Sequence, residues 1–416
     1  MLRRHVLKLF GAGLLMGSVC GGVQADTPKA RDAIGAKMPV SIYLSLPPSS
    51  ARVLDGFVQE YQQTHTYLDI QVKNFPRSED MYQELCSTSK PSPTMAIVEN
   101  SWLPSLVQHQ PNLYPVETWM PKEQFGFSWA IKNNAQIPLW EASQVNGTLY
   151  ALPYFFSTKA LIYNTDVMLK AGIKQVPTTW DQVLAAAKKI SDPKATQPQM
   201  TLWMGNPDNP GSIARNFQML VWQSGGDGLA ANASAATPVA VQSVVDYLKK
   251  VNPGLAPVDG PPASIPVGMY IGNVEDYLTL RNTGVPVKTA MIPGFDKFQR
   301  ISETQSWSLA MFKNVPEKEL YKVQELAFFM VEFQQQLRFA EQTPYLAAHL
   351  KVFDNPFYRR ERLADHSNLR VFLNSVGKSK IVDTSGRAPE RYLSIGRLLG
   401  PVLRGEKTPQ DLIPLR

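Results

Sequence analysis

Short apolar segments alternate with amphipathic ones along the first hundred residues of this chain. Residues 40–46 alternate between apolar and polar positions, as a strand with one buried face does, and apolar residues then recur at helical spacing from Val53 to Tyr61. Residues 68–72 and 95–98 predict two further strands. This order is typical of an α/β fold, in which helices cover both faces of a parallel sheet.

The middle of the chain repeats this order with clearer helix boundaries. A predicted strand at residues 160–163 is followed by a predicted helix at 165–171, which we expect Gly172 to end. Thr179 and Gln182 have the spacing of a capping box, so another helix is predicted to begin directly after Thr179.

Two further helices are predicted in the second half of the chain. Thr237 and Pro238 supply an N-cap and a first-turn proline, and residues 316–342 sustain an apolar helical face up to Thr343. The 33 prolines are spread over many connections, so no single linker divides the chain into two sequential halves. The pattern leaves open a pair of lobes through which the chain passes more than once.

Residues 1–25 have the three parts of an export signal. A basic start precedes the apolar run of residues 9–19, and residues 23–25 form a small-x-small cleavage site. A membrane anchor is the alternative, but glycines interrupt the run and it is shorter than the ~20 residues that span a bilayer. Arg3 and Arg4 resemble a twin-arginine export motif, so we expect a periplasmic protein that is exported in the folded state.

Charge and cysteine content narrow the class of protein. The chain has 42 Lys and Arg against 35 Asp and Glu, and three of the basic residues lie in the export segment, which leaves 39 − 35 = +4. So small a surplus, without a basic block, argues against nucleic acid as a partner. Cys86 is the one cysteine after residue 25, so neither an intramolecular disulfide nor a CxxC metal or redox motif is expected.

Signatures of catalysis or metal binding are missing from the sequence. The four histidines after residue 25 form no HExxH motif, and the chain contains neither a GxSxG elbow nor a P-loop. No pair of carboxylates stands out as a hydrolase dyad, which is defined by its separation in space. We therefore expect no metal and no cofactor, and no motif favours an enzyme.

Aromatic residues near turns give a more specific indication. Ring faces in loops at strand ends can stack on the C–H surface of a sugar or polyol, and ligands of open α/β sheets bind at the carboxyl ends of strands. Packing in the core is the alternative for each ring. The residues concerned are Trp102, Tyr154, Phe155, Phe156, Trp203, Trp222, Tyr270, Trp307 and Tyr345.

One stretch of about 35 residues carries a family resemblance. It consists of NGTLYALP at residues 146–153, STKALIYNTD at 157–166, LKAG at 169–172 and PTTW at 177–180. This combination strongly resembles the family 1 extracellular solute-binding proteins, the periplasmic receptors of ABC importers for maltose, other oligosaccharides and glycerol-3-phosphate. Shorter matches extend the resemblance across nearly the whole chain after residue 25, among them AIVE at 96–99, WQSGG at 222–226, TPYL at 343–346 and GEKTP at 405–409.

The resemblance implies an α/β fold of the type II periplasmic-binding-protein class, with two α/β lobes joined by a hinge and a ligand cleft between them. The first lobe would comprise residues 26–140 and 305–342, and the second residues 146–291 and 343–416. It also implies a monomer that holds a carbohydrate, a polyol or a polyol phosphate and delivers it to an inner-membrane ABC permease. The solute would stabilise the closed arrangement by touching both lobes.

Within this family, the glycerol-3-phosphate receptors match the chain most closely at the site. Glu99, Ser157 and Tyr345 stand at the positions of their cleft glutamate, cleft serine and late tyrosine. At the end of a buried strand, Glu99 would accept two hydroxyl protons of a polyol, and a hydrogen bond to a charged group contributes roughly 1.5–3 kcal/mol. A solvated loop acid and a simple turn serine are the alternatives for Glu99 and Ser157.

Three further matches depart from the pattern of those receptors. Phe75 stands at a cleft aromatic without the hydroxyl of a tyrosine, and Asn273 falls where a serine is expected. Arg387 matches their C-terminal arginine approximately; it would form a bidentate fork on a phosphate, and a surface arginine is the alternative. We interpret Trp222, Trp307 and Tyr345 as aromatic walls on which the solute stacks. Packing in the core is the alternative for each of them. These departures weaken the assignment of a phosphate and leave the carrier function intact.

Three functions of different classes follow. The leading one is a periplasmic receptor for a polyhydroxylated solute, such as a sugar or glycerol-3-phosphate. One alternative is a periplasmic glycan or phosphodiester hydrolase, which would turn over a chromogenic substrate. The other is an interaction protein such as a chemoreceptor adaptor, which would bind no small solute. Thermal-shift screening separates the receptor from the adaptor, because a ligand at about 100 times its dissociation constant adds ~2.7 kcal/mol of stability.

Exchange of both arginines of the export segment tests the export route. We expect Arg3→Lys with Arg4→Lys to remove the protein from the periplasmic fraction, because the arginine pair defines the motif. Immunoblots of the periplasmic and cytoplasmic fractions measure the outcome, with Lys8→Arg as a control that leaves the pair intact. Export of the double variant at the normal level would indicate the general secretory route instead.

Overall fold

The structure of the chain is a computed structural model that describes most residues between 37 and 413. The gaps in the description are residues 88, 111, 120–134, 191–199, 206, 227–234, 253–257, 259–266, 296–299, 362–367 and 382–387. The predicted export segment and the predicted site residue Arg387 lie outside the described residues. In the described part of the chain, no helix combines the length and the hydropathy needed to cross a membrane.

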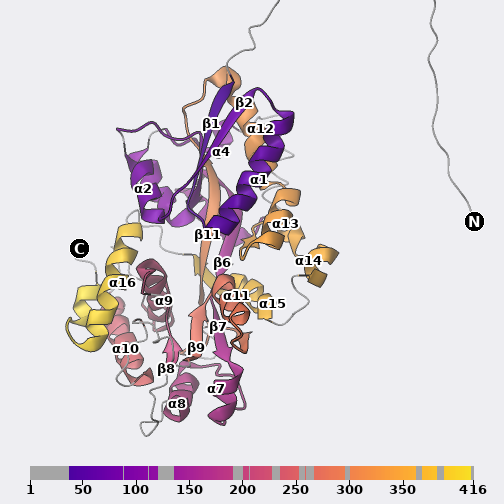
Figure 1. The fold of residues 1–416 in the computed structure, drawn as a ribbon. Helices are drawn as coiled ribbons and strands as arrows, with labels where there is room; N and C mark the ends of the chain where they lie inside the picture. The colour runs from indigo at the N-terminus through magenta and orange to yellow at the C-terminus, as the bar shows by residue number, and fades with distance from the viewer. Residues whose placement is uncertain are drawn as a thin grey trace, which may run out of the picture.

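Two β-sheets organise the chain (Figure 1). The larger sheet has the order β12-β6-β11-β3-β1-β2, with β13 pairing β11 beside this path. Its strands are β1 (Met38–Leu44), β2 (Leu68–Asn74), β3 (Met95–Glu99), β6 (Ala151–Thr158), β11 (Ser302–Met311), β12 (Leu346–Ala347) and β13 (Ser379–Ile381). The smaller sheet has the order β10-β7-β9-β8, formed by β7 (Ala160–Asn164), β8 (Met200–Trp203), β9 (Val267–Gly272) and β10 (Val287–Ala290); β4 (Gln144–Val145) and β5 (Thr148–Leu149) form a separate hairpin.

Helices flank both sheets, which confirms the predicted α/β class. Figure 1 shows α1, α12 and α13 beside the larger sheet, and α8, α9, α10 and α16 around the smaller one. The α-helices are α1 (Pro48–Thr64), α2 (Ser78–Cys86), α3 (Leu103–His109), α4 (Val116–Trp119), α6 (Ile137–Ala142), α7 (Thr165–Lys170), α8 (Trp180–Ile190), α9 (Pro210–Gln223), α10 (Ala236–Val251), α11 (Val274–Asn282), α12 (Leu320–Val331), α13 (Phe333–Gln342), α14 (Pro356–Glu361), α15 (Asn368–Ser375) and α16 (Ala388–Arg404). Short 3-10 helices are η1 (Asn100–Trp102), η3 (Glu317–Glu319), η4 (Leu350–Val352), η5 (Val376–Lys378) and η6 (Pro409–Leu412).

Both sheets are mixed, whereas the sequence pattern predicted a parallel sheet. Strand β1 pairs β2 and β3 in parallel, as strands joined by helical crossovers do. Strand β11 runs antiparallel to both β3 and β6, and it follows the last strand of the smaller sheet in the chain. The prediction of a parallel sheet is therefore right for the first strands of the larger sheet and wrong for its centre. There, no crossover helix that the structure describes joins β11 to the strands beside it.

A single residue joins the two sheets along one path of the chain. Strand β6 of the larger sheet ends at Thr158 and β7 of the smaller sheet begins at Ala160, so Lys159 alone lies between them. The Lys159 amide donates to the carbonyl of Glu303 in β11 (3.2 Å), so backbone pairing continues up to this junction. In Figure 1, β6 and β7 follow one another along the long axis of the molecule.

Segments that are far apart in the chain meet in the larger sheet. The chain therefore enters this sheet more than once, as the absence of a single linker in the sequence had allowed. Strands β6, β12 and β13 lie within residues 146–291 and 343–416, which were assigned to the second lobe, and they pair in the sheet that contains β11. The boundaries of the lobes, with residues 26–140 and 305–342 in the first, stay a prediction.

Buried aromatic side chains hold the helices around the smaller sheet in place. Trp180 is fully buried, its Nε1 donates to Gln223 Oε1 (2.6 Å), and the Tyr247 hydroxyl donates to the Trp180 carbonyl (2.8 Å). Trp222 lies in the same apolar cluster. Since buried polar groups need partners, these bonds fix α8, α9 and α10 relative to one another.

The ends of the central helices follow the local sequence signals. Gly172 has a φ of +67° directly after α7, a conformation that favours glycine, which confirms the predicted end. The Thr179 hydroxyl accepts a hydrogen bond from the Gln182 amide (3.3 Å), as a capping residue does. Gln182 Oε1 accepts from the Thr178 amide (2.7 Å), one residue before the expected partner. The predicted capping box is therefore present on one side only.

The single helix predicted at residues 316–342 is wrong, because it is divided into α12 and α13. Glu332 between them has an extended backbone (ψ 166°), although the apolar face continues on both sides. The Gln336 side-chain amide donates to the Val331 carbonyl (2.7 Å) and so satisfies an acceptor at the break. Periodicity alone does not reveal an interruption of this kind.

Close contact between α16 and α9 requires a glycine. A Cβ atom added to Gly396 of α16 would overlap the carbonyl oxygen of Pro210, the first residue of α9. The backbones of the two helices therefore approach each other at the point where α9 begins, and the first two turns of α9 carry Ser212 and Arg215.

We expect Gly396→Ala to lower the free energy of unfolding by about 1–3 kcal/mol, because the added methyl group must push α16 away from α9. Urea unfolding followed by tryptophan fluorescence measures the change. Gly377→Ala is the matched control, since a Cβ there meets nothing within 4 Å. Equal stabilities of the two variants would contradict the close packing of α16 on α9.

Candidate functional site

A cavity of about 580 Å³ lies between elements of the two sheets. From the larger sheet it is lined by residues at the carboxyl end of β3 and in β11, and from the elements around the smaller sheet by the N-terminal turns of α9 and α11 and by α16. Its volume is within the range of about 300–1,000 Å³ that is typical of small-molecule sites. We refer to this cavity, lined by Glu99, Lys159, Arg215, Gln305, Trp307 and Tyr345 among others, as the cleft.

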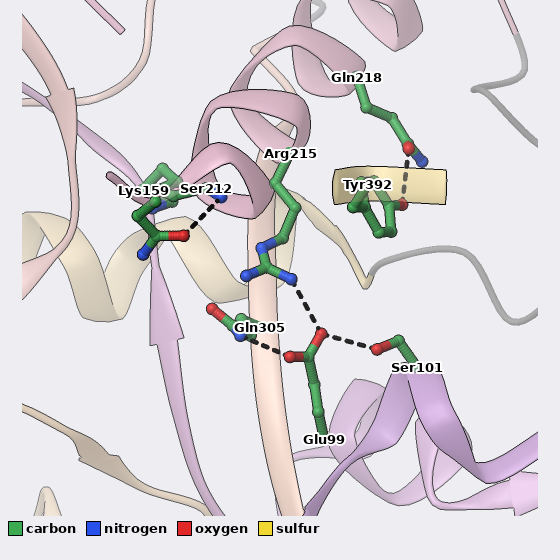
Figure 2. A network of polar contacts seen from close by, with 9 residues as sticks. Glu99, Ser101, Lys159, Ser212, Arg215, Gln218, Gln305 and Tyr392 are labelled. Carbon is green, nitrogen blue, oxygen red and sulfur yellow. Dashed lines mark hydrogen bonds and ion pairs between the residues drawn. The ribbon is translucent and has the colours of Figure 1, made fainter. Parts of the chain in front are cut away.

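Glu99 is the centre of the polar network in the cleft (Figure 2). It is the last residue of β3 and is only 5% exposed. One carboxylate oxygen accepts hydrogen bonds from the Ser101 hydroxyl (2.7 Å) and from Arg215 Nη1 (3.1 Å). The other oxygen accepts from Gln305 Nε2 of β11 (2.7 Å). A buried carboxylate that is held by three donors has a fixed orientation toward the cavity.

The ion pair between Glu99 and Arg215 crosses the cleft. Figure 2 shows the Arg215 side chain extending from α9, beside the smaller sheet, to the carboxylate at the end of β3 in the larger sheet. Burial alone would lower the pKa of Arg215, but the attraction of Glu99 and Glu303 raises it above its ordinary value. The guanidinium carbon lies 5.7 Å from the centre of the Tyr392 ring, and Nε has no hydrogen-bond partner among the described residues.

A second buried cation, Lys159, lies on the same wall. It is 4% exposed, and its Nζ contacts the hydroxyl of Ser212 in the first turn of α9 at 3.3 Å. Burial raises the pKa of Glu275, at the start of α11, and the positive charge of Lys159 opposes that rise. The cleft thus holds charges of both signs at short range.

Aromatic rings form the apolar part of the wall. Trp307 and Tyr345 meet edge to face, with ring centres 5.2 Å apart, and Phe155 supports Trp307 from behind at 5.2 Å. Trp102 and Tyr392 line the same cavity. Rings packed in this way are held in a fixed orientation, and an aromatic wall suits the C–H surface of a sugar ring.

Four of the predicted site residues line the cleft: Glu99, Asn273, Trp307 and Tyr345. Asn273 lies there as the N-cap of α11, where its side chain accepts a hydrogen bond from the Asp276 amide (3.0 Å) and Asp276 accepts from the Asn273 amide. This reciprocal pair fixes the first turn of α11 at the edge of the cavity. The structure therefore brings these four residues together from four separate segments of the chain.

Three other predicted site residues do not line the cleft. Phe75 is 6% exposed and packs edge to face on Tyr43, although its neighbours Asn74 and Pro76 reach the cavity. Ser157 is buried in β6, where it pairs in register with Gln305, and it is not among the residues that line the cavity. Trp222 is held in the apolar cluster of the smaller sheet, where the helical face that it shares with other apolar residues points inward. Packing, the alternative interpretation for Trp222, is what the structure shows.

Sequence reasoning missed Arg215, Lys159 and Gln305. Lys159 carried a detectable signal, since it is a single charged residue between two apolar strand segments. Arg215 has no such signal, because one arginine in an amphipathic helix is ordinary, and only the packing of α9 directs it across the cleft. Gln305 is recognised only once the register of β11 against β6 is known.

The side chains of the cleft can bind a solute through hydrogen bonds. Carboxylate oxygens, a guanidinium, an ammonium and a carboxamide offer acceptors and donors for hydroxyl groups within reach of flat aromatic faces. Among the residues that the structure describes, no group of three His, Cys, Asp or Glu is arranged to hold a metal ion.

Known families and curated proteins match parts of the chain. The model of a family described as bacterial extracellular solute-binding protein matches residues 56–364. A stretch of 57 residues is 42% identical to the sn-glycerol-3-phosphate-binding periplasmic protein UgpB of Agrobacterium fabrum. That stretch covers 13% of each of the two chains, and the aligned part of the first curated relatives is 21% of their length.

Two solved structures share the fold over most of the chain. The cyclic alpha-maltosyl-1,6-maltose binding protein of Arthrobacter globiformis has a TM-score of 0.71 and 19% identity, with coverage of 90% of this chain and 96% of that one. UgpB of Mycobacterium tuberculosis, in complex with glycerophosphocholine, has a TM-score of 0.72 and 16% identity, with coverage of 90% and 95%. These likenesses confirm the predicted fold, a type II periplasmic-binding-protein fold with two α/β lobes.

We expect Arg215→Met to destabilise the protein and to let the two sides of the cleft separate. The substitution keeps much of the apolar stem but leaves Glu99 buried without its cation, which costs about 1–3 kcal/mol. Urea unfolding measures the loss of stability, and small-angle scattering measures the expected rise in the radius of gyration.

Arg338→Met is the matched control for this experiment. The ion pair of Arg338 with Glu60 lies away from the cleft and is 39% and 53% exposed, so its loss has little effect. If Arg215→Met behaved like the control in both measurements, the ion pair would not hold the cleft together.

Proposed function

Because the chain belongs to the bacterial extracellular solute-binding protein family, we propose that it captures a carbohydrate or polyol in the cleft and delivers it to an inner-membrane ABC permease. The family comprises binding proteins, which fits a site built of hydrogen-bonding groups and ring faces. Export to the periplasm and a monomeric state, as expected from the sequence, are part of this proposal.

One observation carries the proposal: a buried and fully oriented carboxylate faces the cavity beside two packed aromatic rings. Glu99 is held by donors from both sides of the cleft, and Trp307 and Tyr345 line the same cavity. A sugar offers hydroxyl groups around its edge and C–H groups on its faces, so this combination matches both. The solute would connect the two lobes by bonding to groups from each of them.

The charges in the described wall favour a solute without net charge. Arg215 is paired with Glu99, and Arg77 is paired with Asp80 at 2.6 Å. Lys159 lies near Glu303 and Glu275. Burial raises the pKa of each of these two carboxyl groups, and the positive charge of Lys159 opposes the rise. Each described cation of the wall thus already has a nearby carboxylate. The hydroxyl groups of a sugar donate to carboxylates and accept from cations without disturbing this balance.

Glycerol-3-phosphate or a glycerol phosphodiester is the second candidate. It is favoured by the 42% identical stretch shared with a glycerol-3-phosphate-binding protein and by the fold shared with a complex of glycerophosphocholine. The predicted phosphate fork, Arg387, would have to supply the charge that the described wall does not leave free. We expect Arg387→Ala to abolish binding of the phosphorylated solute and to change binding of a neutral sugar much less.

Titration calorimetry with maltose, a cyclic oligosaccharide, glycerol, glycerol-3-phosphate and glycerophosphocholine tests the proposal. For the solute that binds, we expect Trp307→Ala to weaken affinity about tenfold or more, because the stacking face is lost. Glu99→Gln should also weaken it, since a carboxamide accepts fewer hydroxyl protons. Tyr321→Ala, an exposed aromatic far from the cavity, is the control and should leave the affinity unchanged.

Turnover and binding assays on the same variants decide between the function classes. Turnover of a chromogenic glycoside or phosphodiester that disappears in Glu99→Gln would favour the hydrolase. An absence of heat and of thermal stabilisation across the whole panel would favour the adaptor. An unchanged dissociation constant in Glu99→Gln would remove Glu99 from the site.

A further inference from the structure

We infer that Glu303 is a specificity-determining residue of the cleft, because it acts as the internal counter-charge of Lys159 and Arg215 and thereby opposes an anionic solute. The inference deepens the proposed function and rests on it. Glu303 matches none of the site residues expected from the sequence, and it does not line the cavity itself. Its influence is electrostatic and acts from one layer behind the wall.

The register of the larger sheet places Glu303 behind the cleft. Side chains alternate between the two faces of a strand, so Glu303, Gln305 and Trp307 share one face of β11. Gln305 and Trp307 line the cavity, and the irregularity of β11 begins only after Trp307. Glu303 therefore points to the cavity side of the sheet but is buried beneath the residues that line the cavity.

Glu303 is also the direct cross-strand neighbour of Lys159. Thr304 pairs with Thr158, and the Lys159 amide donates to the Glu303 carbonyl, so Lys159 and Glu303 stand opposite each other on adjacent segments. Side chains of directly opposite residues in an antiparallel pair point to the same face. Glu303 is buried inside the protein, whereas Lys159 lines the cavity.

The carboxylate of Glu303 is unusually isolated. The residue is 0% exposed, and neither carboxylate oxygen has a hydrogen-bond partner among the described residues. An isolated buried carboxylate is costly unless nearby charges compensate for it or it takes up a proton. An apolar residue would fill this position at lower cost, so the carboxyl group of Glu303 needs an explanation other than packing.

Charged groups approach Glu303 from each neighbouring element. Lys159 comes from the β6–β7 junction, Arg215 from α9 and Glu99 from the end of β3. Lys380 of β13 is paired with Glu303 in register, and its Nζ lies over the Trp222 ring, 5.6 Å from the ring centre. Glu275 of α11 interacts with Lys159 on the far side.

The balance of these charges makes the affinity for an anion depend on pH. Burial raises the pKa of Glu303, while Lys159 and then Arg215 oppose the rise and Glu99 adds to it. Below this raised pKa the carboxyl group is neutral, so the two cations have one negative charge fewer near them and an anion is favoured. As the pH rises through the pKa, Glu303 ionises and repels the anion. A neutral sugar is affected little on either side.

Two pairs of probes that differ by one carboxyl group measure this selectivity: glucose and glucuronate, and glycerol and glycerate. At a pH above the raised pKa of Glu303, we expect Glu303→Gln to raise the ratio of anion to neutral affinity about tenfold, because it removes a charge without changing the shape of the side chain. Glu332→Gln is the matched control, since burial also raises the pKa of Glu332 but no charged group of the cleft contributes to that rise.

The wild-type protein provides a second, independent measurement. As the pH falls through the raised pKa of Glu303, the affinity for the anionic member should rise by up to about tenfold per pH unit, and the affinity for the neutral member should stay constant. Calorimetry in two buffers of different ionisation enthalpy should detect uptake of a proton with the anion only. This measurement holds even if Glu303→Gln does not fold.

The outcomes separate the inference from the proposed function. If neutral sugars bind but neither the substitution nor the pH changes the ratio, the inference is overturned and the proposed function stands. If Glu332→Gln raises the ratio as much as Glu303→Gln, the effect is not specific to Glu303 and the inference is likewise overturned. If no probe of either charge binds to any variant, the proposed function fails, and the inference fails with it.

Discussion

A buried charge must find partners, and in this protein that requirement links the two halves of the cleft. Glu99 ends a fully buried strand of the larger sheet, so its carboxylate has little access to water. Two of its donors, Ser101 and Gln305, come from its own side, and the cation comes from α9 beside the smaller sheet. Because desolvation penalises an unpaired carboxylate, the ion pair favours an arrangement in which the two sides lie close together. A solute that replaces or bridges this contact must therefore offer hydrogen bonds of comparable quality.

The junction at Lys159 gives this contact its geometry. One residue separates a strand of the larger sheet from a strand of the smaller one, so the two sheets cannot move independently at that point. Arg215 lies farther along, in the second turn of α9, whose first residue is held against α16 at Gly396. A rotation about the junction would thus change the distance between Arg215 and Glu99 much more than the distance between Lys159 and Glu303.

The sequence predicted what is local and missed what depends on register. Strand and helix periods placed β1–β3, α7 and α8 within a few residues, and Gly172 and Thr179 end and begin helices as their chemistry requires. Glu99 was singled out through the family resemblance and through its place directly after an apolar strand, and the second of these is also a local feature. Trp222 was assigned to a wall because sequence does not tell which aromatic faces a cavity and which faces the core. Arg215, Gln305 and Glu303 depend on how α9 docks and how β11 pairs, and these contacts lie far apart in the chain.

Paired charges suit a hydroxyl-bearing solute for a physical reason. A hydroxyl group both donates and accepts, so it can lie between a carboxylate and a guanidinium and satisfy both without adding a charge of its own. The net charge of the buried site is then the same before and after binding, and no ionised group is left without a partner. An anionic group would instead compete with Glu99 for Arg215 and with Glu303 for Lys159, and would leave one of these carboxylates buried and unbalanced. Under the proposed function, selectivity by charge would therefore arise from the way the protein neutralises its own interior, and the rings of Trp307 and Tyr345 would provide the shape.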